Sequence, residues 1–241
     1  MQETQLINEY VLKISKIIEE TLSVKVFRVE LPKDANIGFY PGQFFMVSFV
    51  NDPEIKTSRA YSIASSPLNK DYLEIALDKV GPFTTKLFTM KEGELLKFKG
   101  PYGKFYFSED MKNNLMLIAG GTGITPLISI IRYCNDKKLS NKIKFLYSVR
   151  TPSDIIYKEE LENIKKSNKN FDYIVTITRP NSENWKGRIG RIDRELLKQN
   201  IQNIEESLYY LCGPKEFVHN IVEMLESFGA KKEQIKADIW G

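Results

Sequence analysis

Cysteine and histidine are scarce in this 241-residue chain, and their scarcity excludes several kinds of metal site. The cysteines are Cys134 and Cys212, which are far apart and have no CxxC spacing, and His219 is the single histidine. Iron–sulfur clusters usually need four thiolates, and zinc sites are built from cysteine and histidine, so we expect no metal centre in this chain. Two cysteines also make no disulfide framework, which favours a reduced, cytoplasmic setting.

The sequence also lacks long apolar runs and blocks of like charge. No apolar stretch approaches the length of a membrane span, and the N-terminus has no basic region followed by an apolar run. We therefore expect neither a membrane span nor a signal peptide. The 35 basic and 31 acidic residues give a net charge of only +4, and their scattered positions argue against nucleic acid. A mildly basic surface would suit an acidic protein partner, because opposite charges steer encounter.

Short strand-like segments dominate the sequence up to about residue 110. They alternate apolar and polar residues or are rich in β-branched and aromatic ones, and turn residues separate them: 10–18, 24–31, 43–50, 72–78 and 95–99. One helix-like segment, 84–90, interrupts them. Closely spaced short strands are typical of an antiparallel barrel or sandwich, which we expect as a first domain over residues 1–110.

After residue 113, strand-like and helix-like segments alternate. The expected strands are 115–119, 144–149, 173–178, 208–212 and 235–240, and the expected helices are 126–133, 158–166, 193–198 and 216–228. Gly229 is placed to end the last helix. Apolar strands alternating with helices indicate a doubly wound parallel sheet covered on both faces, over residues 111–241. No linker composition separates the two domains, so we expect a fixed interface between them.

The glycine-rich segment AGGTGITP, residues 119–126, is the strongest local sign of a ligand site. Ligands of open parallel sheets bind at the carboxyl ends of the strands, and this segment follows the first apolar strand. Glycines let the backbone approach a pyrophosphate, a helix N-terminus attracts anions, and Pro126 suits the first helical position. The segment is not a P-loop, and Pro126 replaces the third glycine of the GxGxxG fingerprint. An ordinary turn between strand and helix is the alternative.

A second candidate site lies in the expected barrel, in the segment RAYSIASSP, residues 59–67. In a strand, Arg59 and Tyr61 would share one face and Ser62 would point to the other. An arginine can clamp a phosphate, a tyrosine can stack on a ring, and a serine hydroxyl can bond a ring heteroatom. The alternative is a surface strand with a stray charge and a half-buried tyrosine.

Three shorter segments are weaker candidates. GPFTTKL, residues 81–87, leads from a turn into a helix with Thr84 or Thr85 near its cap, which is a further candidate anion site. GPYGKF, residues 100–105, has the composition of a tight turn. LCGP, residues 211–214, ends a strand at the same sheet edge as the glycine-rich segment, where a cysteine is more often a small buried filler than a reactive group.

The order of these segments resembles the ferredoxin–NADP reductase superfamily, which includes reductase components of oxygenases, flavohaemoglobin-like proteins and flavin reductases. Six motifs follow one another, from RAYSIASSP through GPFTTKL, GPYGKF, AGGTGITP and YSVR to LCGP, and the likeness spans roughly residues 8–241. The resemblance implies an N-terminal flavin-binding barrel and a C-terminal nucleotide-binding α/β domain. It implies FAD rather than FMN, because residues 81–85 would cradle a pyrophosphate.

The resemblance also implies roles for individual residues. Arg59 would hold the flavin phosphate, Tyr61 would flank the isoalloxazine ring, and Ser62 would hydrogen-bond near the ring nitrogen that receives hydride. The remaining cofactor-binding residues that it implies are Ala60, Gly81, Thr84 and Thr85 on the barrel, and Gly121, Thr122, Gly123, Cys212, Gly213 and Pro214 in the second domain. Cys212 would lie close to the nicotinamide, and the candidate catalytic residues are Ser62, Cys212 and Asp238.

The C-terminus is similar to that of family members ending in an acidic residue, one spacer and an aromatic that covers the flavin. Here the segment is Asp238-Ile239-Trp240, with Gly241 as a one-residue extension. Trp240 would stack on the flavin and would have to move at least partly aside for nicotinamide to enter. The aspartate is one methylene shorter than the glutamate of that pattern, which weighs against a proton-carrying role for Asp238. A plain buried terminal aromatic is the alternative.

Nucleotide specificity depends on residues at the adenosine end. Ser148 and Arg150 follow the second strand of the α/β domain, where that end would lie. Arg179, Arg188 and Arg191 fall in a segment that could reach a 2′-phosphate, for which arginine has fitting geometry. We therefore expect NADP(H) rather than NAD(H). Two points weigh against this choice: NADH-using relatives also have Arg150, and arginines in loops are usually solvated.

The expected activity is hydride transfer between NAD(P)H and bound FAD, with single electrons passed to or from a separate acceptor. The chain has too few cysteines for its own cluster, so the partner would be a ferredoxin, a flavodoxin or another redox protein. Three alternatives remain open: a free flavin reductase that binds flavin loosely as substrate, an electron-transfer subunit of a larger redox complex, and a regulatory module that senses flavin or nucleotide.

Overall fold

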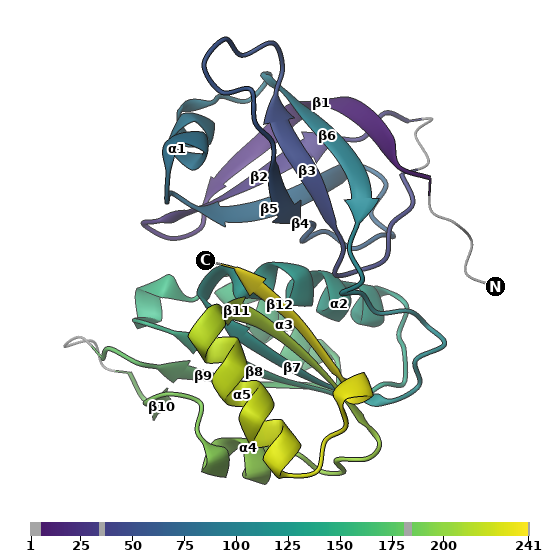
Figure 1. The fold of residues 1–241 in the computed structure, drawn as a ribbon, viewed down its shortest axis with the longest axis vertical. Helices are drawn as coiled ribbons and strands as arrows, with labels where there is room; N and C mark the ends of the chain where they lie inside the picture. Colours follow the sequence, from purple (N-terminus) through teal and green to yellow (C-terminus); the bar gives the residue numbers. More distant parts are fainter. Residues whose placement is uncertain (1–5, 34–36, 181–184, 241) are drawn as a thin grey trace.

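The computed structural model describes residues 6–33, 37–180 and 185–240. In this part of the chain a six-stranded antiparallel sheet is followed by a six-stranded parallel sheet with helices. Figure 1 shows the first unit above the second, with the C-terminus between them. The two-domain architecture expected from the sequence is confirmed.

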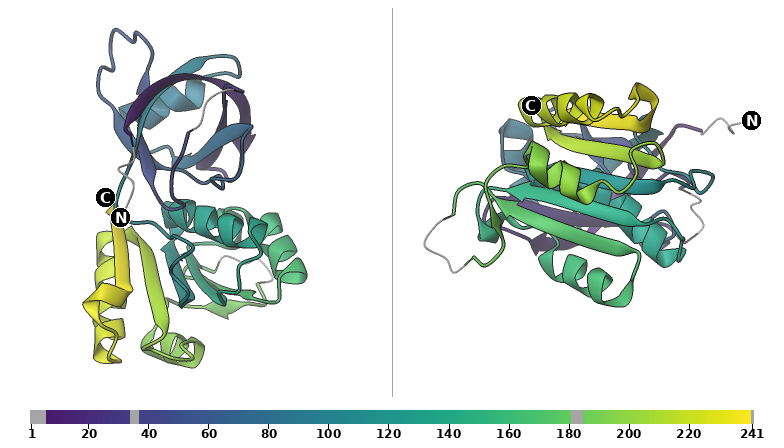
Figure 2. Two further views of the ribbon diagram at one scale, coloured as in Figure 1. Left: turned by 90° about the vertical axis from the view of Figure 1, so that its right-hand side faces the viewer. Right: turned by 90° about the horizontal axis from the view of Figure 1, so that it is seen from below.

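The first domain is a nearly closed barrel. Its elements are β1 (Asn8–Glu19), β2 (Val24–Glu30), β3 (Phe44–Phe49), β4 (Arg59–Ser62), β5 (Tyr72–Asp78), α1 (Pro82–Thr89) and β6 (Leu95–Tyr102). The strands pair in the order β4-β3-β6-β1-β2-β5. Just after β4, the backbone N–H of Ala64 donates to the carbonyl of Glu74 on β5 at 2.7 Å, so the two edges meet. The left view of Figure 2 looks into the resulting ring of strands.

Alternation of side chains along the strands fills the barrel. On β3, Phe45 and Val47 are fully buried, while the residues between them are only half-buried. They pack with Leu96 and Phe98 of β6 and with Ile14 of β1 in one hydrophobic core. Because successive side chains of a strand point to opposite faces, this pattern fixes which residues can face a ligand outside the barrel.

The second domain is a parallel sheet covered on both faces. Its elements are β7 (Asn114–Gly120), α2 (Ile124–Asp136), β8 (Ile143–Val149), α3 (Lys158–Ser167), β9 (Phe171–Ile177), β10 (Arg188–Ile189), α4 (Arg194–Asn200), β11 (Ser207–Pro214), α5 (Lys215–Ser227) and β12 (Ile235–Trp240), with 3₁₀ turns at Gly121–Gly123, Pro152–Asp154 and Lys232–Gln234. The strand order is β10-β9-β8-β7-β11-β12. Side chains of α2 and α3 pack in one core, and those of α4 and α5 pack in another. Strand β7 supplies Leu117 to the first core and Ile118 to the second, which explains why residues 115–119 are wholly apolar.

The starts of two helices differ from the expected ones, and one short strand was not expected. Helix α2 begins at Ile124, so Pro126 is the third helical residue and not the first. A proline is tolerated there because N–H groups in the first helical turn have no intrahelical partner. Helix α1 likewise begins at Pro82, before the expected start at residue 84. Strand β10 was not expected, because a segment as short as Arg188–Ile189 has no readable alternation.

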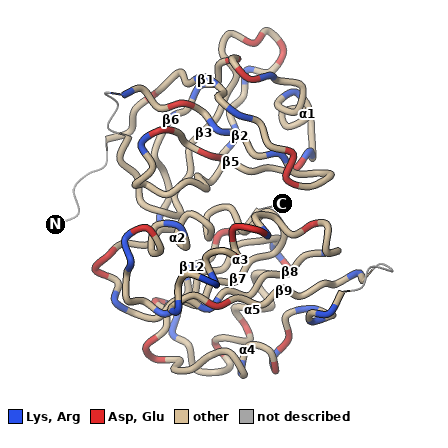
Figure 3. Tube along the Cα trace, turned by 180° about the vertical axis from the view of Figure 1, so that it is seen from behind, with Lys and Arg blue, Asp and Glu red and all other residues tan. Residues whose placement is uncertain are grey.

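The domains contact each other through α2, which lies between the parallel sheet and the barrel (Figure 2). The Ser129 hydroxyl donates to the carbonyl of Ser65 at 2.8 Å, and an Arg132 N–H donates to the carbonyl of Ala64 at 2.8 Å. Basic and acidic residues are interspersed over both domains on the side seen in Figure 3. Within the described ranges, none of the helices has both the length and the apolar character to cross a membrane.

Candidate functional site

A cavity of about 440 Å³ lies between the barrel and the carboxyl edge of the parallel sheet. The barrel contributes the end of β5 and the residues after it, and the α/β domain contributes the ends of β7, β8, β11 and β12. Its lining includes Asp78, Lys79, Val80, Gly121, Thr122, Ser148, Arg150, Asp154, Thr178, Pro214, Phe217 and Trp240. The cavity therefore joins the end of β5, which leads into Gly81, to the predicted glycine-rich segment.

Two glycines give the segment after β7 its shape. Gly121 has a φ of +57°, in the left-handed region that favours glycine. A Cβ on Gly123 would lie 2.1 Å from the carbonyl oxygen of Cys212, so only glycine fits between the two backbones. This contact holds the segment against the end of β11. It brings Gly121, Thr122 and Gly123 together with Cys212 and Gly213, as the sequence predicts.

The C-terminal strand lies beside the same segment. Cys212 and Asp238 are register partners on β11 and β12, and the Cys212 Sγ lies 3.8 Å from Asp238 Oδ2. Burial raises the pKa of the Cys212 thiol well above its ordinary value, and the carboxylate adds to this, so the thiol is neutral. Burial also raises the pKa of Asp238, against the hydrogen bonds that it accepts.

Trp240 reaches the cavity from this strand. It is 40% exposed, and its Cζ2 would lie 4.0 Å from a Cβ on Gly121. The predicted terminal pattern therefore lies where the two domains face each other, and the aromatic is not a plain core residue. The expected extension, Gly241, lies outside the described residues.

On the barrel, β4 carries four of the predicted residues, and it lies beside α1. The Arg59 Cζ lies 5.9 Å from the Phe83 ring centre, and the Tyr61 ring lies 6.0 Å from the same ring. Arg59 is exposed, and its guanidinium donates to the carbonyl of Ser58. Burial raises the pKa of Tyr61 to about 12, so its phenol stays neutral. The Ser62 hydroxyl has no hydrogen-bond partner among the described residues, and Ala60 is exposed beside it.

The start of α1 is open in front of the helix. A Cβ on Gly81 would meet nothing within 4 Å. The Thr84 hydroxyl accepts hydrogen bonds from the N–H groups of Val80, at 2.8 Å, and Gly81, at 3.0 Å, so it caps the helix. Thr85 is exposed. Backbone N–H groups of the first helical turn have no intrahelical partner and can bind an anion here.

The predicted arginines of the adenosine end separate into two groups. Arg150 and Arg179 lie together, because the N–H of Arg179 donates to the carbonyl of Arg150 at 2.7 Å, and both side chains are exposed. Arg188 lies on β10, where its guanidinium pairs with Asp193. Its Nε is buried without a partner in the described part of the chain. Arg191 is exposed.

Sequence reasoning missed an acidic group in the cavity. Asp78, the last residue of β5, accepts a hydrogen bond from the Ser23 hydroxyl at 3.0 Å. Burial raises the pKa of Asp78, while the side chains of Ser23 and Thr122 and the charge of Arg150 act to lower it. Its position three residues before Gly81, the first residue of the motif GPFTTKL, is the signal that could have identified it.

These residues fit a dinucleotide on each side of the interface. The barrel offers an exposed guanidinium, a neutral phenol ring, a hydroxyl without a partner and an open helix start. The α/β domain offers a glycine backbone that faces a cavity and two exposed arginines. Side chains and backbone groups of these kinds can bind the aromatic, phosphate and ring-heteroatom groups of a dinucleotide.

Two protein families match this arrangement of domains. Residues 11–107 match the oxidoreductase FAD-binding domain, and residues 117–223 match the oxidoreductase NAD-binding domain. Sulfhydrogenase 1 subunit gamma of Pyrococcus furiosus is 30% identical over 238 residues, which cover 95% of this chain and 79% of that protein.

Other relatives are longer than this chain. One subunit of the Na(+)-translocating NADH-quinone reductase of Marinomonas is 29% identical over 83% of the chain, but the match spans only 52% of that protein. NADH-cytochrome b5 reductase 2 of Meyerozyma guilliermondii is 31% identical over 78% of the chain and 65% of its own length.

Solved structures share the fold over nearly the whole chain. The ferredoxin reductase in carbazole 1,9a-dioxygenase has a TM-score of 0.85 at 24% identity, covering 99% of this chain and 71% of that one. A ferredoxin NADP+ reductase from Neisseria gonorrhoeae, with bound FAD and NADP, has a TM-score of 0.81 at 22% identity, covering 96% and 98%. The chain therefore belongs to the ferredoxin–NADP reductase superfamily of flavin-dependent oxidoreductases, with an FAD-binding barrel and a domain for a nicotinamide nucleotide.

Proposed function

We propose that this chain catalyses hydride transfer between NAD(P)H and FAD held on the barrel, and exchanges single electrons with a separate redox protein. The observation that carries this proposal is the cavity shared by the end of β5 and the glycine-rich segment. Bound FAD supplies the redox chemistry, because its ring exchanges a hydride with nicotinamide and single electrons with an acceptor. The protein contributes binding and alignment.

The barrel residues bind the flavin nucleotide in this proposal. Arg59 holds a phosphate with its exposed guanidinium, Tyr61 lies against the ring, and Ser62 hydrogen-bonds a ring nitrogen, with Ala60 beside them. At the start of α1, Gly81 leaves room for the pyrophosphate, and the backbone of Thr84 and Thr85 faces it. The Thr84 hydroxyl acts indirectly, because it caps the helix.

The α/β domain binds the nicotinamide nucleotide. Gly121, Thr122 and Gly123 contact it at the carboxyl edge of the sheet, together with Gly213 and Pro214. Trp240 occupies part of the space between the domains and moves aside when nicotinamide enters. Cys212 and Asp238 lie behind the glycine-rich segment as a hydrogen-bonded pair, and we assign them to shaping the nicotinamide site.

NADPH is the proposed nucleotide. Ser148, Arg150 and Arg179 form the adenosine end, and the two guanidinium groups are exposed on neighbouring backbones. Arginine suits a 2′-phosphate because its planar fork matches phosphate oxygens. Arg188 is the weaker candidate for this contact, because Asp193 already neutralises it.

A ferredoxin, a flavodoxin or another redox protein is the proposed acceptor. A second candidate function, an electron-transfer subunit of a larger complex, is favoured by two relatives that are named as parts of complexes, sulfhydrogenase 1 subunit gamma and the subunit of the Na(+)-translocating NADH-quinone reductase. The scarcity of cysteine supports a cytoplasmic location and an external acceptor.

Reduction of a one-electron dye such as ferricyanide by NADPH tests this function. FAD-loaded protein should turn over with the dye, and the same protein stripped of flavin should not. Colourless protein that reduces added FMN or riboflavin would instead identify a free flavin reductase. Protein that binds FAD and nucleotide without any turnover would identify a regulatory module.

A further inference from the structure

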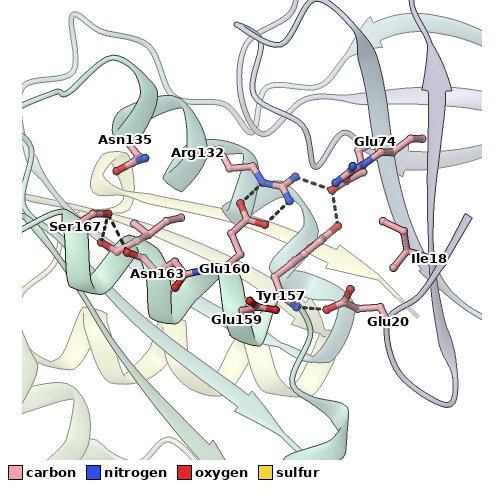
Figure 4. Close-up of a pocket in the computed structure, with 12 residues that line it drawn as sticks. Ile18, Glu20, Glu74, Arg132, Asn135, Tyr157, Glu159, Glu160, Asn163 and Ser167 are labelled. Carbon is pink, nitrogen blue, oxygen red and sulfur yellow. Dashed lines mark hydrogen bonds and ion pairs between the residues drawn. The ribbon is translucent and has the colours of Figure 1, made fainter. Parts of the chain in front are cut away.

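A partly buried network of ion pairs joins the domains at a second place, outside the cavity just described (Figure 4). Its centre is Glu74 on β5, whose side chain has an exposed fraction of 0%. Glu74 Oε1 accepts hydrogen bonds from Arg132 Nη1 at 2.7 Å and from the Tyr157 hydroxyl at 3.0 Å. Glu74 Oε2 accepts from Arg28 Nε, within the barrel, at 2.7 Å.

Arg132 connects three separate parts of the fold. From α2, its Nη1 reaches Glu74 and also the carbonyl of Ala64, at 2.8 Å, just after β4. Its Nε and Nη2 both bind Glu160 of α3 at 2.7 Å. Only the fork of a guanidinium can make these contacts together, since an ammonium group is a single point.

The charges in this network hold one another in place. Burial would raise the pKa of Glu74, but the charges and hydrogen bonds of Arg132 and Arg28 outweigh it and hold that pKa below its usual range. The carboxylate is therefore ionised at neutral pH. Because a buried charge without its partner is strongly destabilising, the domains favour the one orientation in which Arg132 meets Glu74.

Helix α2 carries this anchoring to the nucleotide site. The helix begins directly after the 3₁₀ turn Gly121–Gly123 of the glycine-rich segment, and its side chains Ser129 and Arg132 bind the carbonyls of Ser65 and Ala64. Those carbonyls follow closely after Ser62 on the same backbone. Helix α2 therefore connects the glycine-rich segment to the backbone that follows Ser62.

The loop that follows β8 and contains Arg150 is also anchored to the barrel. Tyr157 precedes α3 and follows the loop that contains Arg150, and its backbone is left-handed, with a φ of +56°. Its N–H donates to Glu20 of the barrel at 2.6 Å, and its hydroxyl donates to Glu74. A strained backbone of this kind persists where surrounding contacts determine it.

We propose that Arg132 is a positioning residue for hydride transfer, which sets the placement of the glycine-rich segment against the segment that carries Tyr61 and Ser62. This inference rests on the proposed function. Arg132 acts through α2 and touches neither substrate nor cofactor. Displacement of the reacting groups by about 1 Å can slow a reaction about 100-fold, so a small change at Arg132 should affect the chemical step.

The test compares Arg132→Lys with Arg28→Lys. Both substitutions keep a positive charge beside Glu74 and remove a guanidinium fork, but only the first breaks contacts between domains. For Arg132→Lys we expect the rate of flavin reduction at saturating nucleotide to fall about 10- to 100-fold, with KM for the nucleotide and flavin content near those of the unchanged protein. For Arg28→Lys we expect a rate within about threefold of the unchanged protein.

Amide hydrogen exchange of the flavin-free protein gives a readout that does not depend on activity. In Arg132→Lys, amides of residues 121–135 and 62–65 should exchange faster, and in Arg28→Lys they should not. If neither variant changes amide exchange at these residues, the positioning role is wrong. It is also wrong if the rate of flavin reduction falls equally in both variants. Faster exchange in Arg132→Lys, together with no flavin reduction by the unchanged protein, would overturn the proposed function. The role of Arg132 in fixing the orientation of the two domains would still stand.

A milder variant covers the case in which Arg132→Lys does not fold. Glu160→Gln weakens the contact of Arg132 with α3 and leaves its contact with Glu74. We expect a smaller fall in the same rate at unchanged KM. An unchanged rate together with unchanged exchange would contradict the proposal.

Discussion

Gly123 packs against the carbonyl of Cys212 so closely that a Cβ on the glycine would lie 2.1 Å from that oxygen. The contact joins the glycine-rich segment to the end of β11. It links a motif of the sequence to the geometry of the nucleotide site. Because both partners are backbone, neither can rotate away.

Gly123→Ala should therefore destabilise the protein. The methyl group forces the two backbones apart, and overpacking of this kind costs about 1–3 kcal/mol. Thermal unfolding of the flavin-free protein measures the loss. Gly38→Ala is the matched control, because a Cβ there would meet nothing within 4 Å. Equal unfolding temperatures for the two variants would show that the close contact is absent.

Removal of the Arg59 side chain should weaken flavin retention. A hydrogen bond between a guanidinium and a phosphate contributes about 1.5–3 kcal/mol, so the Kd for FAD should rise about 10- to 100-fold in Arg59→Ala. Fluorescence titration of flavin-free protein measures it, and Lys56→Ala, an exposed cation near β4, is the control. If the Arg59 variant purifies with full flavin, the assigned role is wrong.

Trp240→Ala should ease nucleotide entry. In the proposed function the nicotinamide enters the space beside Gly121 that the indole occupies, so removal of the indole should lower KM for the nucleotide several-fold. Steady-state kinetics with ferricyanide as the electron acceptor, for both the variant and the unchanged protein, checks this. An unchanged KM would indicate that the aromatic does not cover the site.

Arg150→Ala and Arg179→Ala should each reduce the preference for NADPH. Loss of one arginine from a 2′-phosphate site should cut kcat/KM for NADPH about tenfold and leave NADH nearly unaffected. Arg194→Ala serves as the control, because this exposed arginine lies on α4 and its guanidinium donates to the Ser227 hydroxyl of α5. A parallel loss with both nucleotides would place these arginines at the pyrophosphate, and no loss would remove them from the site.

Asp238→Asn should change how stability depends on pH. Burial raises the pKa of Asp238, so the folded protein binds its proton more tightly than the unfolded chain does. Stability therefore falls as pH rises from the unfolded-state pKa towards the folded one. The melting temperature of Asp238→Asn minus that of the unchanged protein should therefore increase as the pH rises from 4 to 7. A constant or shrinking difference across that interval would contradict the pKa shift.

Local pattern was enough to predict the fold and the edge of the parallel sheet at which the cavity lies. The apolar run of β7 followed by glycines indicated a parallel sheet with a ligand edge, and carboxyl ends of parallel strands meet at one edge. That argument also placed Pro214 of β11 near Gly121. The exact start of α2 was missed because the 3₁₀ turn Gly121–Gly123 has no pattern of its own.

Contacts between the domains could not be predicted, because they join residues with no local relation. Glu74 and Arg132 look like ordinary solvated charges in the sequence, yet both are buried by the approach of α2 to β5. Asp78 meets Thr122 for the same reason. Arg188 was grouped with Arg179 and Arg191 because the three fall in one segment, and its pairing with Asp193 depends on the short strand β10.

The central claim is tested most directly by an anaerobic absorbance spectrum of the purified protein, followed by titration with NADPH and then NADH. The account predicts yellow protein whose flavin bands bleach on addition of nucleotide, with NADPH the more effective of the two. Protein that remains colourless after incubation with FAD would contradict it.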